Sequence, residues 1–290
     1  MNIKEFVVKE SKEISLKDFN PSYTGKYNAN NKKAAAKRLE RNKAKMAELQ
    51  DKLYAHDRHS ILIIFQAMDA AGKDSSIKHV MSGLNPQGTQ VFSFKQPSKE
   101  ELDHDYLWRT TKALPERGRI GIFNRSYYEE VLVVKVHNLV KYQKIPEELI
   151  DKNIWKNRYR QIRNFEDHIY KNGTTIIKFF LHLSKDEQKR RFLKRLDTPS
   201  KNWKFSAADL KERNLWDKYQ KCYEEAINKT STKNSPWYIV PADNKWFTRL
   251  VVSEVIVQTL KKLKMEYPKL NDEQLANLKA YKEQLIGISN

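Results

Sequence analysis

The segment ILIIFQAMDAAGKDSSIKH, residues 61–79, carries the most information about the fold of this chain. It begins with an apolar run typical of a buried strand and ends in a stretch compatible with a helix. Between the two lies a turn of small residues that contains Gly72 and Lys73. Such a turn presents backbone N–H groups, together with a lysine, to a phosphate group. The segment therefore predicts a phosphate-binding loop.

This loop departs from the usual pattern G-x-x-x-x-G-K-[ST] at two positions. Ala67 replaces the first glycine, and Asp74 replaces the final Ser or Thr. Asp69 adds a carboxylate, which would repel phosphate unless Mg²⁺ lies between them. We interpret Asp69 as a metal ligand, and Asp74 as an acid of the first helical turn or a second ligand. On this stretch alone, an ordinary strand-to-helix turn remains the alternative.

Strand-like and helix-like segments alternate along the rest of the chain. We expect strands at residues 61–65, 90–94, 121–124, 174–183 and 237–241. We expect helices at residues 32–54, from 98 toward 114, at 146–171, from 184, at 206–229 and at 245–264. This alternation predicts an α/β fold in which helices cover both faces of a parallel sheet.

The chain of 290 residues is expected to hold one main domain, at residues 56–267. Residues 1–55 are expected to form an N-terminal arm, extended over 1–30, and a helix. Residues 268–290 form a tail without a functional signature. The start MNIKEFVVKE is not an apolar leader, no run is long enough for a membrane span, and Cys222 is the single cysteine. We therefore expect a cytoplasmic protein without a membrane partner.

The formal net charge of +19 indicates an anionic partner. Nucleic acid, an anionic membrane surface and a phosphate-rich substrate are the candidate classes. A solvated, lysine-rich surface without a specific partner is the alternative.

A second group of charged residues follows the third predicted strand. The stretch GRIGIFNRSYYEEVL delivers Asn124, Arg125, Glu129 and Glu130 to the end of that strand. Because ligands of doubly wound sheets bind beyond the carboxyl ends of the strands, this group should face Lys73. An arginine holds phosphate oxygens with two hydrogen bonds, and a nearby glutamate holds metal. We expect Glu129, Glu130 or both to share Mg²⁺ with Asp69, although one of them is expected to be an ordinary helix-start acid.

The segment SKDEQKRRFLKRLDTPSKNWKF, about residues 184–206, is strongly basic. Closely spaced cations repel one another unless an anion is present, so we expect a helical lid that closes over phosphates. Arg190, Arg191 and Lys204 are among its cations. A solvated helix face is the alternative.

Taken in order, five segments resemble the second family of polyphosphate kinases, the thymidylate-kinase-like P-loop enzymes. They are QAMDAAGKDSSIKHVMSGLNPQG, FKQPSKEELDHDYLWR, IFNRSYYEEVLV, KFFLHLSKDEQKRRFLKRLDTPSKNWKF and PWYIVPADNKWFTRLVV, and the resemblance covers roughly residues 30–265. It implies a three-layer P-loop kinase fold with a helical lid and an N-terminal helical extension. It also implies reversible transfer of the terminal phosphoryl group of inorganic polyphosphate to a nucleotide with Mg²⁺, and a homo-oligomer, either a dimer or a tetramer.

The resemblance assigns roles to residues of the two strand ends and of the lid. Asp69, Lys73 and Arg125 are the expected catalytic residues. The expected binding residues for polyphosphate and nucleotide are Ala70, Ala71, Gly72, Asp74, Ser75, Asn124, Glu129, Arg190, Arg191 and Lys204. Asn124 stands where relatives that use mainly one nucleotide have aspartate, which resembles the subgroup that phosphorylates both AMP and ADP.

Two rival functions make different predictions. An ATP-dependent nucleoside monophosphate kinase of the same fold would need no polyphosphate. A nucleic-acid-binding protein would interleave aromatic stacking residues with its cations. Trp203 and Phe205 are the only candidates in the lid, and we interpret them as anchors, so we expect no nucleic-acid partner.

Overall fold

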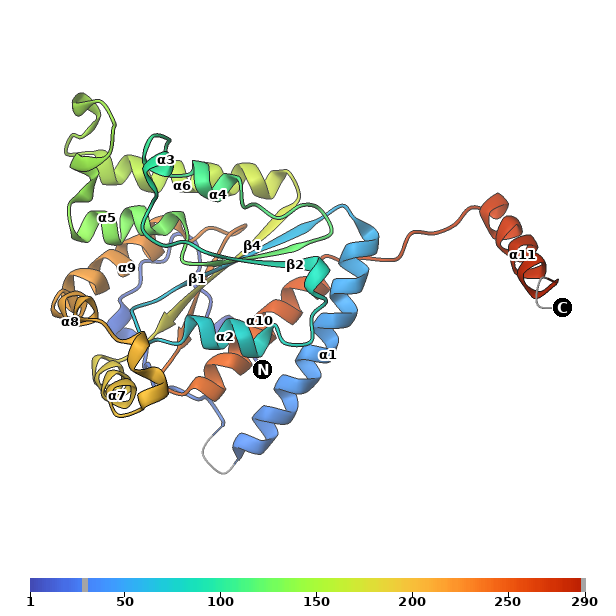
Figure 1. The fold of residues 1–290 in the computed structure, drawn as a ribbon, viewed down its shortest axis with the longest axis horizontal. Coiled ribbons are helices and arrows are strands. Elements are labelled where there is room, and N and C mark those ends of the chain that lie inside the picture. Colours follow the sequence, from blue (N-terminus) through green and yellow to red (C-terminus); the bar gives the residue numbers. More distant parts are fainter. Residues whose placement is uncertain (28–30, 288–290) are drawn as a thin grey trace.

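The computed structural model describes residues 1–27 and 31–287, and its centre is a five-stranded sheet (Figure 1). The strands occur in the order β2-β3-β1-β4-β5, and every neighbouring pair is parallel. Each lies within one residue of its predicted bounds: β1 (Ser60–Gln66), β2 (Thr89–Ser93), β3 (Ile120–Asn124), β4 (Thr174–His182) and β5 (Trp237–Pro241). The α/β prediction with a parallel sheet is confirmed.

Both faces of the sheet are covered, which explains why β1 is apolar throughout. Ile61, Ile63 and Phe65 belong to one buried cluster, and Leu62 and Ile64 belong to the other. The first cluster includes residues of α1 (Lys32–His56), α2 (Lys73–Val80) and α10 (Lys245–Lys262). The second includes residues of α6 (Ile154–Lys171) and α9 (Trp216–Thr230). The molecule therefore has the three layers that the sequence predicts.

Three predicted helices are shorter or divided. The segment from residue 98 contains α3 (Lys99–Leu102) and α4 (Trp108–Thr111), and the segment from residue 206 contains α8 (Ala207–Asn214) and α9. Capping boxes at Ser98 and Ser206 begin α3 and α8. The prediction of one helix over residues 146–171 is wrong.

The cause lies before the start of α6. Pro146 precedes only a short 3-10 turn, Glu147–Leu149. Asp151 Oδ1 then accepts a hydrogen bond from the backbone N–H of Asn153 at 2.9 Å. This local turn competes with helical hydrogen bonding, so α6 begins only at Ile154.

The N-terminal arm packs along the outer edge of β5. Val8 N–H donates to the Trp237 carbonyl at 2.8 Å, and Ile239 N–H donates to the Phe6 carbonyl at 2.8 Å. Val7 and Tyr238 form an isolated antiparallel bridge. Two short 3-10 turns, Ile3–Glu5 and Leu16–Asp18, belong to the same arm. The arm thus covers the β5 edge; the predicted arm positions 28–30 lie outside the described residues.

The C-terminal tail contains α11 (Asp272–Gly287), which projects away from the sheet (Figure 1). All its residues are exposed, and tail positions 288–290 lie outside the described residues. Within the described ranges, no helix is both long enough and apolar enough to cross a membrane.

Candidate active site

The phosphate loop forms the predicted turn between β1 and α2. Gly72 has φ = +103°, which side chains rarely adopt, and Ala70 has φ = +62°. These left-handed values reverse the chain within a few residues, so α2 begins just beyond the end of β1. The free N–H groups and positive dipole of the helix start therefore lie at the carboxyl edge of the sheet, where an anion is stabilised.

Lys73 lies within a cluster of charged side chains from two strand ends. Its ammonium donates to the Ala67 carbonyl at 2.9 Å, which holds the side chain back over the loop. Burial lowers the pKa of Lys73 and Arg125 lowers it further, while Asp69, Glu129 and other carboxylates act in the opposite direction. The phosphate loop and the end of β3 therefore form one electrostatic unit, as the sequence predicts.

Arg125 connects the two halves of this unit. It follows β3 directly and has φ = +64°, a strained value for a residue with a side chain. Its Nη2 lies 3.3 Å from Asp69 Oδ1. Burial acts to lower the pKa of Arg125, but the carboxylates of Glu129 and Asp69 raise it overall. The guanidinium thus stays charged, and its side chain is 40 % exposed, so a phosphate can reach it.

Glu129 is the second carboxylate of the unit. Burial raises its pKa, while Arg125 and Lys73 oppose the shift. With its amide turned to satisfy both neighbours, Gln66 donates to Glu129 Oε1 at 3.0 Å and accepts from the Ser126 N–H at 3.2 Å. Gln66 is the last residue of β1, so it fixes Glu129 relative to the phosphate loop.

Asn124 and Asp74 are direct partners. Asn124 Nδ2 donates to Asp74 Oδ1 at 2.6 Å and lies 3.3 Å from Ser93 Oγ. Asp74 does occupy the first turn of α2, as expected, but its carboxylate accepts a hydrogen bond from Asn124 at the end of the neighbouring strand β3. An aspartate at position 124 would instead face Asp74 with a second negative charge. The neutral amide of Asn124 is therefore compatible with an acid at position 74, where the usual pattern has Ser or Thr.

Glu130 is separated from the expected metal group by its own partners. Its Oε1 accepts from Arg158 Nε at 2.8 Å, and its Oε2 accepts from Gln143 Nε2 at 2.7 Å. Burial raises the pKa of Glu130, and Arg158 opposes the shift. In the described part of the chain, no three His, Cys, Asp or Glu side chains are grouped to hold a metal ion. Asp69, Glu129 and Glu130 therefore do not assemble as one set, and Glu130 orients Arg158.

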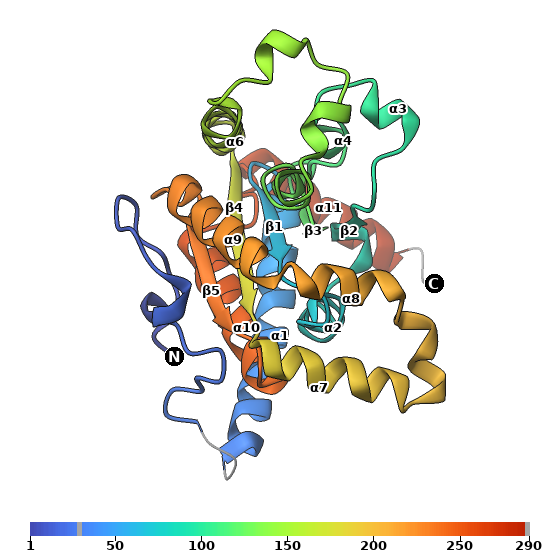
Figure 2. The same cartoon turned by 90° about the vertical axis from the view of Figure 1, so that its left-hand side faces the viewer.

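The lid segment, residues 184–206, lies next to the start of α2 (Figure 1, Figure 2). It comprises α7 (Lys185–Leu196) and a 3-10 turn, Pro199–Lys204. Five of its lysines are exposed and have no ion pair with a described residue: Lys185, Lys189, Lys194, Lys201 and Lys204. Lys204 lies over the exposed ring of Trp203, 4.9 Å from its centroid. Arg190 is also exposed, with two hydrogen bonds to Glu187.

Arg191 is a different kind of residue from the other lid cations, because it is only 6 % exposed. Its guanidinium donates to Glu187, to the carbonyls of Ala70 and Ala71 in the phosphate loop, and to the carbonyls of Ala242 and Asp243 after β5. All its donor atoms are thus occupied by the protein. The structure makes Arg191 a clamp on the phosphate loop, in place of the free polyphosphate contact that the sequence suggested.

A cleft of about 1020 Å³ opens beside Arg125 and Glu129. Its lining comes from residues 94–97, 101–107 and 109, from residues between 125 and 145 that follow β3, and from Arg158, Gln161 and Glu212. His104 stacks on Trp108 with ring centroids 4.0 Å apart, and Arg109 lies over Phe94. A volume of this order accommodates a nucleotide-sized ligand. The cleft is therefore large enough for a nucleotide, and Arg125 and Glu129 of the charged unit form part of its wall.

Comparison with known proteins matches residues 29–268 to the family Polyphosphate kinase 2 (PPK2). The chain belongs to this family. The sequence prediction of the family, and with it an enzyme of the polyphosphate kinase type, is confirmed.

Two relatives and one solved structure illustrate the membership. The chain is 58 % identical over 244 residues to an ADP-polyphosphate phosphotransferase of Rhodopseudomonas palustris, covering 83 % of this chain and 84 % of the relative. It is 46 % identical over 266 residues to an AMP/ADP-polyphosphate phosphotransferase of Meiothermus ruber, covering 92 % and 96 %. The crystal structure of polyphosphate kinase 2 from Arthrobacter aurescens TC1 matches with a TM-score of 0.88 at 39 % identity, covering 97 % and 96 %.

Sequence reasoning missed several residues that support the site of this polyphosphate kinase family member. Gln188 Nε2 donates to the Asp69 carbonyl at 3.0 Å, and Arg249 Nη2 donates to Ser75 Oγ at 2.8 Å. Gln66 supports Glu129 as described above. Each of the three reaches the site from a different element: Gln66 ends β1, Gln188 lies in α7, and Arg249 lies in α10. Only Gln66 could have been noticed in the sequence, because it is a polar amide at the end of an apolar strand. In the structure it is fully buried.

Proposed function

We propose that this chain transfers the terminal phosphoryl group of inorganic polyphosphate to ADP and AMP, reversibly and with Mg²⁺. The main support for this proposal is the contact of Arg125 with Asp69 next to Lys73. This group lies between a nucleotide-sized cleft and the basic lid segment. The names of the Rhodopseudomonas and Meiothermus relatives, an ADP- and an AMP/ADP-polyphosphate phosphotransferase, support both acceptors. Asn124, which pairs with Asp74, is the feature by which we include AMP.

The chemical difficulty is the approach of two polyanions. The bond between the terminal phosphorus and its bridging oxygen breaks, and an oxygen of the acceptor phosphate forms the new bond. That oxygen is already anionic near neutral pH, so the site needs no strong base. Lys73 and the amides at the start of α2 hold a phosphate near the transfer point, and Arg125 neutralises charge on the phosphoryl group in transit.

The donor set fits Mg²⁺ bound largely through substrate. Magnesium in phosphoryl-transfer sites commonly takes one or two carboxylates, with phosphate oxygens and water completing its shell. Asp69 is 30 % exposed, and Glu129 is close enough for the two carboxylates to affect each other electrostatically. These two residues would hold the ion. When bound, it reduces the repulsion between donor and acceptor phosphates.

The lid lysines serve the polyphosphate chain. Their exposed ammonium groups form no ion pair with a described residue, so a bound polyanion would offset the repulsion between them. Closure of the lid segment over the phosphates would also exclude water, which competes as an acceptor. Lys204 belongs to this group. Arg190 is an exposed lid cation too, although it pairs with Glu187, whereas Arg191 holds the phosphate loop.

The decisive experiment mixes purified protein, Mg²⁺ and long-chain polyphosphate with AMP or ADP and resolves the nucleotides by chromatography. We expect ADP from AMP and ATP from ADP. Lys73→Met should reduce the rate on the order of a hundredfold or more, because it removes a preorganised charge. Product formed from AMP only when ATP replaces polyphosphate would identify a nucleoside monophosphate kinase instead.

We also propose a cytoplasmic homo-oligomer, a dimer or a tetramer, that acts without nucleic acid. Light scattering of the purified protein tests the assembly, and a mobility shift with single-stranded and duplex DNA tests the partner. A monomer, or DNA binding at physiological salt, would contradict the respective part of this proposal.

A further inference from the structure

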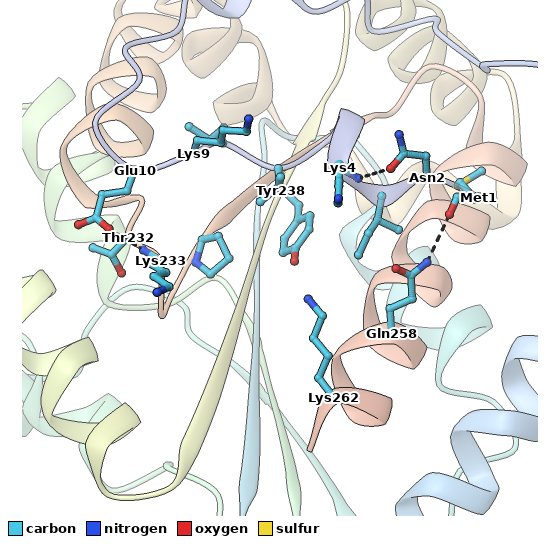
Figure 3. A pocket seen from close by; sticks show the side chains of 14 residues that line it. Met1, Asn2, Lys4, Lys9, Glu10, Thr232, Lys233, Tyr238, Gln258 and Lys262 are labelled. Atoms are coloured by element: carbon cyan, nitrogen blue, oxygen red, sulfur yellow. Dashed lines mark hydrogen bonds between the residues drawn. The ribbon is translucent and has the colours of Figure 1, made fainter. Parts of the chain in front are cut away.

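A second pocket lies at the opposite end of the sheet from the phosphate loop. It has a volume of about 560 Å³ and forms where the N-terminal arm crosses the beginning of β5 and the last turns of α10 (Figure 3). Its lining comes from residues 1–10, from residues 232–238 and from Gln258 and Lys262. The phosphate loop lies at the carboxyl end of β1, whereas this pocket lies at the beginning of β5. The pocket and the catalytic cleft have no lining residue in common.

The pocket is strongly basic. Lys4, Lys9, Lys233 and Lys262 line it, all four side chains are exposed, and none forms an ion pair with a residue in the described ranges. Glu10 is its only carboxylate, and that group accepts from the backbone N–H of Lys233 at 3.0 Å. Four like charges around one hollow repel one another, and an anion bound between them relieves that repulsion.

Tyr238 provides an independent sign of a ligand. The residue is only 6 % exposed, yet its hydroxyl has no hydrogen-bond partner among the residues that the structure describes. Figure 3 shows this hydroxyl directed into the pocket, toward the same space as the Lys262 ammonium. Burial raises the pKa of Tyr238, so the hydroxyl keeps its proton and is available as a donor. The ring is therefore buried, whereas the hydroxyl at its tip opens into the pocket and is free to donate to a ligand there.

The walls of the pocket determine what kind of anion fits. Ile3, Val7, Val8 and Pro236 give it an apolar surface. An inorganic phosphate chain gains nothing from such a surface, whereas a ligand with a flat organic ring does. The pocket therefore combines a place for a ring with a place for phosphates.

We propose that this pocket binds a nucleoside phosphate at a site separate from the catalytic cleft. The base lies against the apolar wall formed by Val7 and Pro236, and the phosphates lie among the four lysines. The Tyr238 hydroxyl donates to the ligand. Bound ligand also joins the arm to α10, so residues 1–10 become more protected in the complex.

The test is photolabelling of the full chain with 8-azido-ADP, followed by mapping of the labelled peptides, without polyphosphate. Label is expected in residues 1–10 or 232–238 as well as in the cleft around residues 94–109. Lys262→Glu should weaken labelling of the arm about tenfold, since it reverses a charge beside the ligand. Tyr238→Phe keeps the ring and removes only the hydroxyl, so it should also reduce arm labelling.

Lys261→Glu is the matched control, because Lys261 is exposed in the same helical turn but does not line the pocket. It should leave arm labelling unchanged. Absence of label from both residues 1–10 and residues 232–238, or label there that survives Lys262→Glu and Tyr238→Phe, overturns the proposal. Arm labelling that tripolyphosphate abolishes but unlabelled ADP does not would also overturn the nucleoside assignment. Because arm and cleft peptides are read separately, loss of cleft labelling alone would count against the proposed function and not against this pocket.

Discussion

Replacing Arg191 by methionine tests whether this residue is a clamp or a polyphosphate contact. The side chain is buried and donates to one carboxylate and four carbonyls, two of them in the phosphate loop. Methionine has a similar helix propensity, so the change removes the guanidinium without penalising α7 itself. The carbonyls of Ala70 and Ala71 would lose this donor, and Glu187 would lose one of its two arginines.

Breaking a buried charged group away from its partners typically costs about 3–5 kcal/mol. We therefore expect Arg191→Met to lower the free energy of unfolding by about that amount, measured by urea denaturation followed by circular dichroism. Turnover should fall as well, because Ala70 is held at a left-handed φ that the clamp supports. The Michaelis constant for polyphosphate should change less than the turnover number.

Arg190→Met is the matched control in the neighbouring position. Arg190 binds the same Glu187 but its side chain is 67 % exposed, and exposed ion pairs contribute about 0–1 kcal/mol. Equal losses of stability in the two variants would refute the clamp. So would an Arg191→Met protein of normal stability whose only defect is a raised Michaelis constant for polyphosphate.

Three further predictions concern the charges of the site. Asn124→Asp should lower the free energy of unfolding, measured with urea, more at pH 8 than at pH 5. It places a second carboxylate against Asp74, whose Oδ1 lies 2.6 Å from the amide nitrogen of Asn124. Equal losses at the two pH values would argue against that contact. Burial raises the pKa of Glu129 above its ordinary value of 4.5. The acid limb of the enzyme's pH–rate profile should therefore have its midpoint above pH 4.5, because activity is lost as the pH falls and Glu129 becomes protonated. Glu129→Gln should remove that limb, and an unchanged limb would exclude Glu129 as its source. Polyphosphate affinity should fall steeply with salt, and Lys201→Gln with Lys204→Gln should reduce the log–log slope by about one unit per lysine; an unaltered slope would place the chain elsewhere.

Much of this molecule follows from local sequence patterns. The apolar run of β1 and the turn of small residues before Lys73 each act within a few residues, and the structure shows both as expected. The capping box at Ser98 acts over the same short range. The wrong prediction of a single helix over residues 146–171 also has a local cause. There the Asp151 side chain supplied a local hydrogen bond that hydrophobic spacing did not reveal.

Pairing between distant residues followed no local rule. Glu130 and Glu129 are neighbours in sequence, yet one meets Arg158 and the other meets Lys73 and Arg125. Arg190 and Arg191 are neighbours as well, and only the second reaches the phosphate loop. In each pair, adjacent side chains of like charge leave the backbone in different directions, and the packing of other elements decides what each one meets.

The sequence by itself thus determined the parallel sheet, the tight turn between β1 and α2, and the family, because strand and helix periodicity and loop motifs are properties of neighbouring residues. Only the tertiary structure decided that Asn124 holds Asp74, that Glu130 serves Arg158, and that Arg191 clamps the loop it was expected to overlie. A side chain's partner depends on which elements the fold brings within about 3 Å, and that distance is set by the packing of the whole domain.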